Sequence, residues 1–412
     1  MTPARVPAKF KAEPFAYHQE LTLDVAALTN LGEGVARADG WVVFVPGALP
    51  GERVRARVWH NAKNFSRADL LEVLVPAKER VEPRCPLFGK CGGCQYQNFE
   101  YGAQLAWKTQ QVAELFARIG KISFPVSPCR GSPKRYGYRS KITPHFERPR
   151  SGDANFPIGF LAAGTARRIV DVPACPIATD AVNAALPRLR ALTRERAARG
   201  EFRRGATLLL RETLEGVVSD AKAPVSERVG ELTLRFVAGD FFQNNPFILP
   251  EFAEFAVRAA RGNGACRFLA DAYCGSGLFA LSAAKFFERT IGVEVSEDAV
   301  VKARENAALN GLANCSFVAG SSEIIFKEIP FPPEETALII DPPRKGCGAD
   351  FIAQMLAFAP QRVVYVSCAP DTQARDLQTV LESGKYALEA VQPFDLFPQT
   401  RHIENIAVLA KK

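Results

Sequence analysis

The ten residues FLADAYCGSG, at positions 268–277, decide the fold of the C-terminal half of the chain. The apolar run 268–273 is typical of a buried strand, and the glycines that follow predict a turn before an apolar helix at 278–287. The same alternation continues at once, with a predicted strand at 291–295 and a helix at 297–309. Repeated strand–helix units of this kind predict a largely parallel, Rossmann-like α/β sheet.

The turn after the first strand is a candidate site for a nucleoside cofactor. A glycine turn brings backbone close to a ligand, and an acidic residue that ends the second strand, here Glu294, can bind ribose hydroxyls. A dinucleotide site would need a third glycine, but Leu278 and Phe279 follow Gly277. The pattern therefore disfavours NAD, and the stretch DAYCGSG at 271–277 resembles the first motif of S-adenosylmethionine-dependent methyltransferases.

Three further stretches carry side chains with catalytic chemistry. The apolar runs RVVYVSC and ALIID end in Cys368 and Asp341, and FPQTRHIE supplies Glu404 just before another apolar run. Ligands of open α/β sheets bind outside the carboxyl ends of the strands, so we expect one thiol and two carboxylates to share a crevice. The alternatives are a small buried apolar residue for Cys368 and loop capping for Asp341.

Composition bounds the class of protein. A chain of 412 residues with 47% hydrophobic and 23% charged residues predicts two or three globular domains. We find no signal-peptide pattern and no run of about 18 apolar residues, so we expect a cytoplasmic protein that does not contact membranes. We also expect a monomer. In a reducing compartment, each of the ten cysteines is a packing residue, a ligand or a nucleophile.

Residues 1–79 form a predicted OB-type β-barrel. Glycine- and proline-rich turns separate its short apolar strands. The predicted strands are 21–25, 34–37, 41–45, 53–58 and 70–75. The turn sequences GEGVAR and VPGALPGE resemble those of the TRAM domain, and this resemblance implies RNA binding.

Residues 80–239 form a predicted central domain that begins with a cysteine cluster. Cys85, Cys91 and Cys94 lie in the stretch CPLFGKCGGC, and Cys175, also followed by proline, is the best candidate for a fourth thiol. Four thiolates can hold zinc or a [4Fe-4S] cluster. Zinc usually takes two closely spaced pairs, so three cysteines plus one distant cysteine favour the iron-sulfur cluster.

Positive charge is concentrated in the same domain. Between positions 130 and 211 there are 17 Lys and Arg against 6 Asp and Glu, whereas the whole chain has a net charge of only +8. Such a block favours binding of a polyanion, and the alternative is a solvated helix face. Arg139 and Lys141 are candidate phosphate contacts.

Four motifs together identify a family. FFQN at 241–244, DPPRKG at 341–346, SCAPDTQARD at 367–376 and HIEN at 402–405 resemble those of the RNA 5-methyluridine methyltransferases. The resemblance implies a class I methyltransferase domain at 240–412 within a multidomain α/β protein. Members with a TRAM barrel and an iron-sulfur cluster are the bacterial 23S ribosomal RNA enzymes and archaeal transfer RNA enzymes. We expect ribosomal RNA as the substrate, with transfer RNA as the alternative.

The resemblance also implies a role for each candidate residue. Cys368 adds to carbon 6 of uracil, S-adenosylmethionine gives its methyl group to carbon 5, and Glu404 removes the proton there. The implied substrate-binding residues are Asp341, Gln243, Phe241 and Arg344. The implied cofactor-binding residues are Gln243, Tyr273, Gly275, Gly277, Glu294, Ser321 and Asp341.

Two other hypotheses stay open at this point. The first is another S-adenosylmethionine-dependent nucleic-acid methylase, such as an adenine amino-methylase, although Arg344 stands where that class has an aromatic residue. The second is a catalytically silent RNA-binding protein that keeps a structural iron-sulfur cluster. The presence of both Cys368 and Glu404 argues against it.

Overall fold

The computed structural model describes residues 6–149, 155–165, 167–320 and 325–412. The chain divides into two compact units. The first comprises Met1–Gln104, Pro157–Val172 and Gln399–Arg401, and the second comprises Leu105–Phe156, Pro173–Pro398 and His402–Lys412. The three-domain division expected from the sequence stays a prediction.

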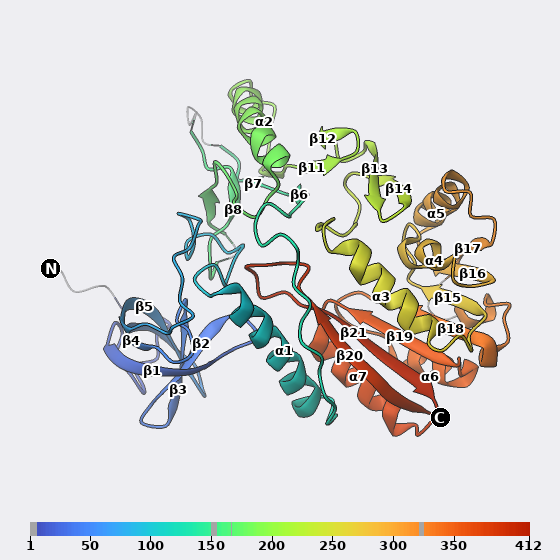
Figure 1. Ribbon diagram of the computed structural model, residues 1–412. Coiled ribbons are helices and arrows are strands. Elements are labelled where there is room, and N and C mark those ends of the chain that lie inside the picture. The colour runs from blue at the N-terminus through green and yellow to red at the C-terminus, as the bar shows by residue number, and fades with distance from the viewer. Residues whose placement is uncertain (1–5, 150–154, 166, 321–324) are drawn as a thin grey trace. The chain divides into compact units, whose positions relative to one another are not determined.

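The first unit contains a closed five-stranded barrel, drawn in blue in Figure 1, with strand order β1-β2-β3-β5-β4. Its strands are β1 (Glu20–Leu28), β2 (Glu33–Ala38), β3 (Trp41–Pro46), β4 (Arg53–Asn61) and β5 (Ser66–Val75). Alternate residues such as Val43 and Val45 are fully buried in the barrel core. Gly34 must be a glycine, since a Cβ there would lie 2.9 Å from the Ala48 carbonyl oxygen. The predicted barrel is confirmed.

The same unit contains a short hairpin of β8 (Gly159–Leu161) and β9 (Ile169–Asp171). The residue pattern at 107–119 indicates a helix, and the corresponding helix α1 (Tyr101–Arg118) begins six residues earlier. Its first four residues belong to the first unit and the rest to the second. The Glu100 carboxylate accepts a hydrogen bond from the Ala103 N–H at 3.0 Å and so caps this first turn. Glutamate is a less common helix cap than serine or aspartate, so the sequence around Glu100 gives little indication that a helix starts there.

The second unit is built on a seven-stranded sheet with the order β17-β16-β15-β18-β19-β21-β20 (Figure 1). Its strands are β15 (Phe268–Ala272), β16 (Arg289–Glu294), β17 (Cys315–Ala319), β18 (Thr336–Ile340), β19 (Arg362–Ser367), β20 (Tyr386–Phe394) and β21 (Glu404–Lys411). The first five are parallel, whereas β21 is antiparallel to both β19 and β20. This confirms the largely parallel sheet and is typical of class I methyltransferases.

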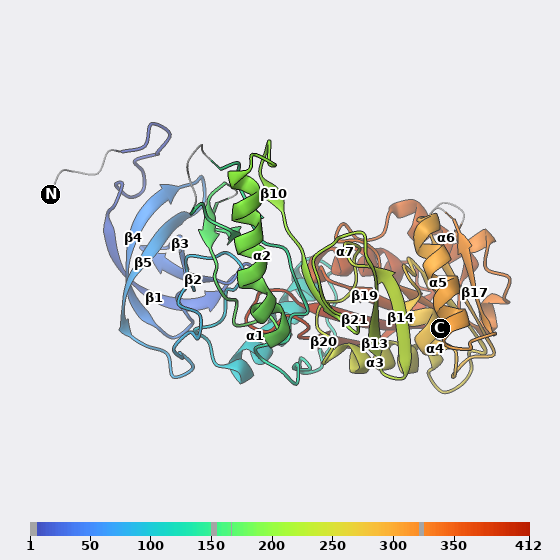
Figure 2. The same cartoon turned by 90° about the horizontal axis from the view of Figure 1, so that it is seen from above.

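Helices cover both faces of this sheet, as Figure 2 shows for α3 and α7. Alternation along β19 explains why: Val364 and Val366 join the core with α3, α4 and α5, and Val363 and Tyr365 join the core with α6 and α7. The helices are α3 (Leu249–Arg261), α4 (Leu278–Ala283), α5 (Glu297–Leu309), α6 (Ala349–Phe358) and α7 (Pro370–Glu382). None of the helices in the described ranges has the length and apolar character of a membrane span.

The helix predicted at 278–287 ends early, at Ala283. The chain tightens there into three-residue turns, with the Ala284 N–H bonded to the Leu281 carbonyl and the Phe286 N–H to the Ala283 carbonyl. Phe287, which follows both turns, is buried, so apolar residues are needed in this segment although it is not helical. Hydrophobic periodicity therefore overestimated the length of this helix.

Smaller elements complete the second unit. They are the helix α2 (Asp180–Ala198), the 3-10 turns η1 (Ile325–Lys327) and η2 (Pro333–Glu335), and the strands β6 (Lys141–Ile142), β7 (His145–Phe146), β10 (Ala206–Thr207), β11 (Leu210–Thr213), β12 (Gly216–Val218), β13 (Pro224–Val229) and β14 (Leu232–Val237). β11 pairs with β6 and β12, β10 with β7, and β13 with β14.

A buried ion pair joins α1 to the segment between β20 and β21. Lys108 of α1 and Asp395, both fully buried, lie 2.7 Å apart, and Lys108 also donates to the His402 carbonyl at 2.9 Å. Replacing Lys108 with methionine leaves the Asp395 carboxylate buried without its cation. We expect this to lower the free energy of unfolding by about 3–5 kcal/mol.

Urea unfolding followed by circular dichroism measures this change. Replacing Lys108 with methionine and Asp395 with leucine together should recover most of the loss, because no charge is then left buried. An unchanged unfolding midpoint in the single variant would show that the ion pair does not contribute to stability.

Candidate active site

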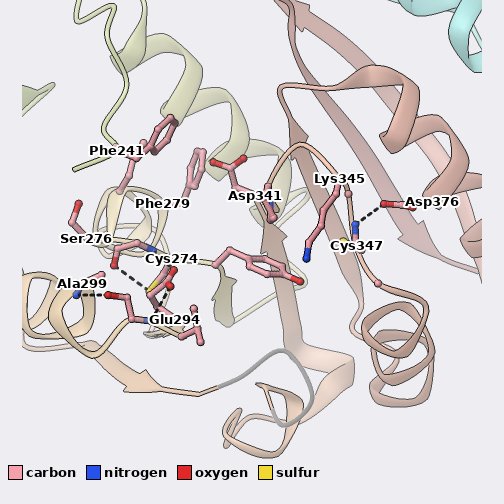
Figure 3. Close-up of a pocket in the computed structure, with 18 of the residues that line it drawn as sticks. Phe241, Cys274, Ser276, Phe279, Glu294, Ala299, Asp341, Lys345, Cys347 and Asp376 are labelled. Atoms are coloured by element: carbon pink, nitrogen blue, oxygen red, sulfur yellow. Dashed lines mark hydrogen bonds between the residues drawn. The ribbon is translucent and has the colours of Figure 1, made fainter. Parts of the chain in front are cut away.

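A pocket of about 1200 Å³ opens at the carboxyl ends of the parallel strands (Figure 3). β15 and β18 are neighbours in the sheet. The chain continues from β15 to β16 in one direction along the sheet and from β18 to β19 in the other, so the strand order reverses between β15 and β18. A crevice at such a switch point is the usual ligand site of an open α/β sheet. The ends of β15, β16 and β18 line the pocket together with residues 240–243.

The turn after β15 has an unusual backbone. Tyr273 has φ +65°, a left-handed conformation that is rare for a non-glycine residue, and Gly275 and Gly277 have φ +53° and +96°. The N–H groups of Tyr273 and Cys274 both bind the Val293 carbonyl, at 3.0 and 3.2 Å. Tyr273 and Gly275 line the pocket, whereas Gly277 is buried at the start of α4 and shapes the turn instead.

Glu294 ends β16 and faces the same pocket (Figure 3). One of its carboxylate oxygens accepts from the Gly275 N–H and the other from the Ser296 N–H, each at 3.1 Å. These bonds fix the carboxylate beside the glycine turn. The geometry fits the predicted binding of a ribose by Glu294.

The FFQN motif forms another wall of the pocket. Gln243 is 7% exposed and lines the pocket, and Phe241 is 80% exposed at its edge. Phe242 lies flat against Phe236, with ring centres 4.3 Å apart. An exposed aromatic ring beside a buried amide is a suitable arrangement for stacking a flipped base while reading its polar edge.

The strand β6 holds this loop in place. The Lys141 ammonium donates to the carbonyls of Gly239 and Asp240, at 3.0 Å each, and Ser140 binds the Asn244 carbonyl through its N–H and its hydroxyl. The ammonium of Lys141 thus has two acceptors within the protein, and a contact of Lys141 with RNA phosphate stays a prediction. The adjacent Arg139 likewise donates to the Lys141 carbonyl at 3.0 Å.

Cys368, Glu404, Asp341 and Arg344 come together at the same edge of the sheet. Cys368 follows β19, Asp341 follows β18, and Glu404 is the first residue of β21, which pairs with β19. The sequence placed Glu404 just before a strand, and the structure places it within one. Asp341 also lines the pocket, so the thiol cluster and the pocket share a side chain.

Burial controls the protonation of this cluster. It raises the pKa of the half-buried Cys368 thiol to about 11, with a further rise from the charges of Glu404 and Asp341, while the nearby Arg344 guanidinium lowers it. Burial also raises the pKa of Asp341 to about 7 and that of Glu404 well above its ordinary value. Burial therefore keeps the Cys368 thiol mostly protonated at neutral pH. A reaction that used this thiol as a nucleophile would need a bound group that favours the thiolate.

Some residues of the site were missed by sequence reasoning. His402 Nδ1 lies 3.0 Å from Arg344 Nη2, and the side chain of Lys345 extends into the pocket (Figure 3). Both belong to motifs already singled out, HIEN and DPPRKG, so the signal was present. Asp271 is also fully buried and accepts a hydrogen bond from the Ala280 N–H at 2.9 Å, which ties β15 to α4.

Two groups of predicted residues remain untested. Ser321 lies outside the described residues. None of the ten cysteines, all of which are described, forms a disulfide. Within the described ranges, no three His, Cys, Asp or Glu side chains are placed to hold a metal ion.

The cysteine cluster fits a metal centre in part. Cys85, Cys91 and Cys94 belong to the first unit and Cys175 to the second. Burial raises the pKa of Cys91, and the charge of Cys85 adds to the rise, so these two sulfurs lie near each other. The [4Fe-4S] cluster therefore stays a prediction.

Similarity to known proteins decides the family. The model of the tRNA (uracil-5-)-methyltransferase family matches residues 215–330 and 333–412, and that of the TRAM domain matches residues 18–71. A Schizosaccharomyces pombe protein named tRNA (uracil(54)-C(5))-methyltransferase is 41% identical over 97% of this chain and 79% of its own length. The chain belongs to the RNA uracil-5-methyltransferase family. It is thus an S-adenosylmethionine-dependent enzyme that methylates carbon 5 of uracil in RNA.

Other members of the uracil-5-methyltransferase family agree with this assignment. A Saccharomyces cerevisiae protein of the same name is 32% identical over 96% of this chain and 74% of its own length. The crystal structure of Pyrococcus abyssi tRNA (uracil-54, C5)-methyltransferase shares the fold, with a TM-score of 0.73 and 23% identity over 95% of this chain and all of that one. The expected closeness to 23S ribosomal RNA enzymes finds no support, since the two yeast relatives are transfer RNA enzymes by name.

Proposed function

We propose that this enzyme forms 5-methyluridine at position 54 of transfer RNA, with Cys368 as the nucleophile and Glu404 as the base. The single observation that carries the chemistry is the meeting of Cys368, Glu404 and Asp341 beside the pocket at the sheet's carboxyl edge. The choice of transfer RNA rests on the names of the two yeast relatives, which match this chain over nearly its whole length.

Carbon 5 of uracil is a poor nucleophile, so the ring must first gain electrons. The Cys368 thiolate adds to carbon 6, which breaks the ring's 5,6 double bond and places negative charge on the carbonyl as an enolate. Asp341 and Gln243 hold the polar edge of the base, and Phe241 packs against its face. Arg344 supplies positive charge next to the thiol, which favours its ionised form.

The pocket is suited to S-adenosylmethionine. Tyr273, Gly275 and Glu294 line it, and the Glu294 carboxylate is fixed beside the glycine turn. When bound there, S-adenosylmethionine supplies an electrophilic methyl group that carbon 5 takes. Gln243 and Asp341 face both this pocket and the proposed base site, so the two sites meet at these residues.

Glu404 completes the cycle. It removes the hydrogen on carbon 5 as a proton, the electrons of that bond restore the 5,6 double bond, and the Cys368 sulfur leaves carbon 6. The pKa of Glu404 is raised by burial and by Asp341, which makes its carboxylate a stronger base than an exposed glutamate. The base must leave its stack to reach these groups.

The remaining features fit RNA as the substrate. We propose that the TRAM barrel and the basic block at 130–211 contact RNA phosphates. We also propose that Cys85, Cys91, Cys94 and Cys175 hold a [4Fe-4S] cluster with a structural role. No step of the methylation uses it.

The substrate is tested with purified protein, S-adenosylmethionine and unmodified RNA transcripts. We expect mass spectrometry of digested nucleosides to detect 5-methyluridine in a transfer RNA transcript. The same transcript with cytidine in place of uridine 54 should give none, because only the target base differs. A 23S ribosomal RNA transcript is the second comparison.

The outcomes separate the hypotheses. Formation of 5-methyluridine in ribosomal RNA but not in transfer RNA would overturn the proposed substrate and leave the chemistry intact. A product that persists in the cytidine 54 transcript would place the target elsewhere in transfer RNA. Methylated adenosine or cytidine would contradict the thiol mechanism itself.

A further inference from the structure

The loop that carries Asp341 and Arg344 docks on the helix that begins directly after Cys368. Three contacts along α7 hold three successive parts of this loop. The Thr372 hydroxyl lies 3.1 Å from the Arg344 carbonyl and 3.0 Å from the Ala369 carbonyl, so its single hydrogen is shared between the loop and the residue that caps α7. Arg375 Nη2 donates to the Lys345 carbonyl at 2.9 Å. Asp376 Oδ2 accepts from the Cys347 N–H at 2.7 Å (Figure 3).

Gly346 allows this close approach. Its φ is +79°, and its N–H closes a turn onto the Pro343 carbonyl at 2.8 Å. A Cβ at this position would collide with Asp376 Oδ2 and lie 2.7 Å from Arg375 Nη2. Both the backbone conformation and the packing therefore require glycine here.

Asp376 joins three elements of the fold. It is 3% exposed, and its Oδ2 atom also accepts from the Tyr365 hydroxyl of β19 at 2.7 Å. Its Oδ1 atom accepts from Nε and Nη2 of Arg375, at 3.0 and 2.7 Å. One buried carboxylate thus connects β19, which leads into Cys368, with α7 and with the loop.

From these contacts we propose that Thr372 and Asp376 are positioning residues that hold Arg344 and Asp341 against Cys368 and so set the reactivity of the thiol. The inference rests on the proposed function, in which Cys368 attacks the uracil. Neither Thr372 nor Asp376 needs to touch the base. They act by fixing the backbone of the loop, and a displacement of about 1 Å in reacting groups can cost about a hundred-fold in rate.

Thr372→Val is the most specific test of the hydrogen bond, because valine keeps the shape of the side chain and lacks only the hydroxyl. We expect kcat for RNA methylation to fall about ten-fold, while KM for S-adenosylmethionine changes less than two-fold. Alkylation of Cys368 by iodoacetamide without RNA, resolved by peptide mass spectrometry, should shift to higher pH because Arg344 no longer favours the thiolate. Thr372→Ser restores the hydroxyl and should restore both readouts.

Ser383→Ala is the matched control. Its hydroxyl also bonds a backbone carbonyl of α7, that of Val380 at 2.6 Å, but at the far end of the helix from the loop. It should leave kcat and the alkylation profile unchanged. Asp376→Asn should change both readouts in the same direction as Thr372→Val, and circular dichroism confirms that each variant is folded.

The inference is overturned if folded Thr372→Val keeps the wild-type kcat or the wild-type alkylation profile, or if serine at 372 fails to restore them. A failure of the proposed function looks different. In that case the unaltered enzyme forms no 5-methyluridine in any RNA, while the alkylation profile still reports whether Thr372 and Asp376 control the thiol.

Discussion

Cys368→Ala should abolish formation of 5-methyluridine, with a fall in rate of about 10⁴-fold or more. The thiolate is the strongest nucleophile in the cluster, because the carboxylates of Asp341 and Glu404 are weaker nucleophiles and Arg344 is a cation. Cys368 does not line the 1200 Å³ pocket, so binding of S-adenosylmethionine should persist in the variant. Loss of turnover with unchanged cofactor affinity would separate the nucleophile from the cofactor site.

The measurement is single-turnover methylation of transfer RNA together with calorimetric titration of S-adenosylmethionine. Cys266→Ala is the matched control, since burial raises the pKa of the Cys266 thiol to about 11 as well. Cys266 lies two residues before β15, at the opposite edge of the sheet from the pocket. Wild-type rates in Cys368→Ala, or equal losses in both variants, would show that the thiol at 368 has no special role.

Glu404→Gln should slow turnover by about 10²- to 10⁴-fold and trap a covalent complex between enzyme and methylated RNA. Glutamine keeps the size of the buried side chain and cannot take the proton from carbon 5. Addition of Cys368 and methyl transfer still proceed, so the intermediate accumulates with the sulfur attached to carbon 6. The substitution also removes a negative charge that raises the pKa of the Cys368 thiol, which favours the addition step.

Denaturing gels with a radiolabelled methyl group detect the trapped species as a protein band that carries RNA. Glu404→Gln combined with Cys368→Ala must lose this band, because the bond that forms it has no sulfur donor. The proposed role would be contradicted by wild-type turnover in Glu404→Gln. It would also be contradicted by an unmethylated adduct, which would assign Glu404 to an earlier step.

The residues at the carboxyl edge of the sheet were predictable because their signals are local. An apolar run that stops at Cys368 or Asp341 has the pattern of a buried parallel strand, and the carboxyl ends of such strands meet at one edge. The same reasoning placed Glu294 and Gly275 correctly at the pocket. It overestimated the helix after Gly277, since apolar periodicity does not distinguish a helix from buried turns.

The contacts of the basic residues could not be predicted from local sequence. Lys141 is a basic residue in a basic block, which is why it was a candidate phosphate contact. Its ammonium binds the carbonyls of Gly239 and Asp240, which follow it in the chain by 98 and 99 positions. The sequence around Lys141 does not predict hydrogen-bond acceptors that are so distant in the chain. The fourth cluster ligand is uncertain for the same reason, because Cys175 is separated from Cys94 by 80 intervening residues.

The sequence by itself determined the family, the parallel sheet, the TRAM barrel and the position of Cys368 and Asp341 at the ends of strands, because strand patterns and glycine turns are local features. Only the tertiary structure decided that α7 holds the Asp341–Cys347 loop, through Thr372 and Asp376 about 30 residues away. It also decided the protonation of the cluster. Both depend on which groups packing buries together, and burial raises the pKa of Cys368 and Glu404 only when the chain is folded.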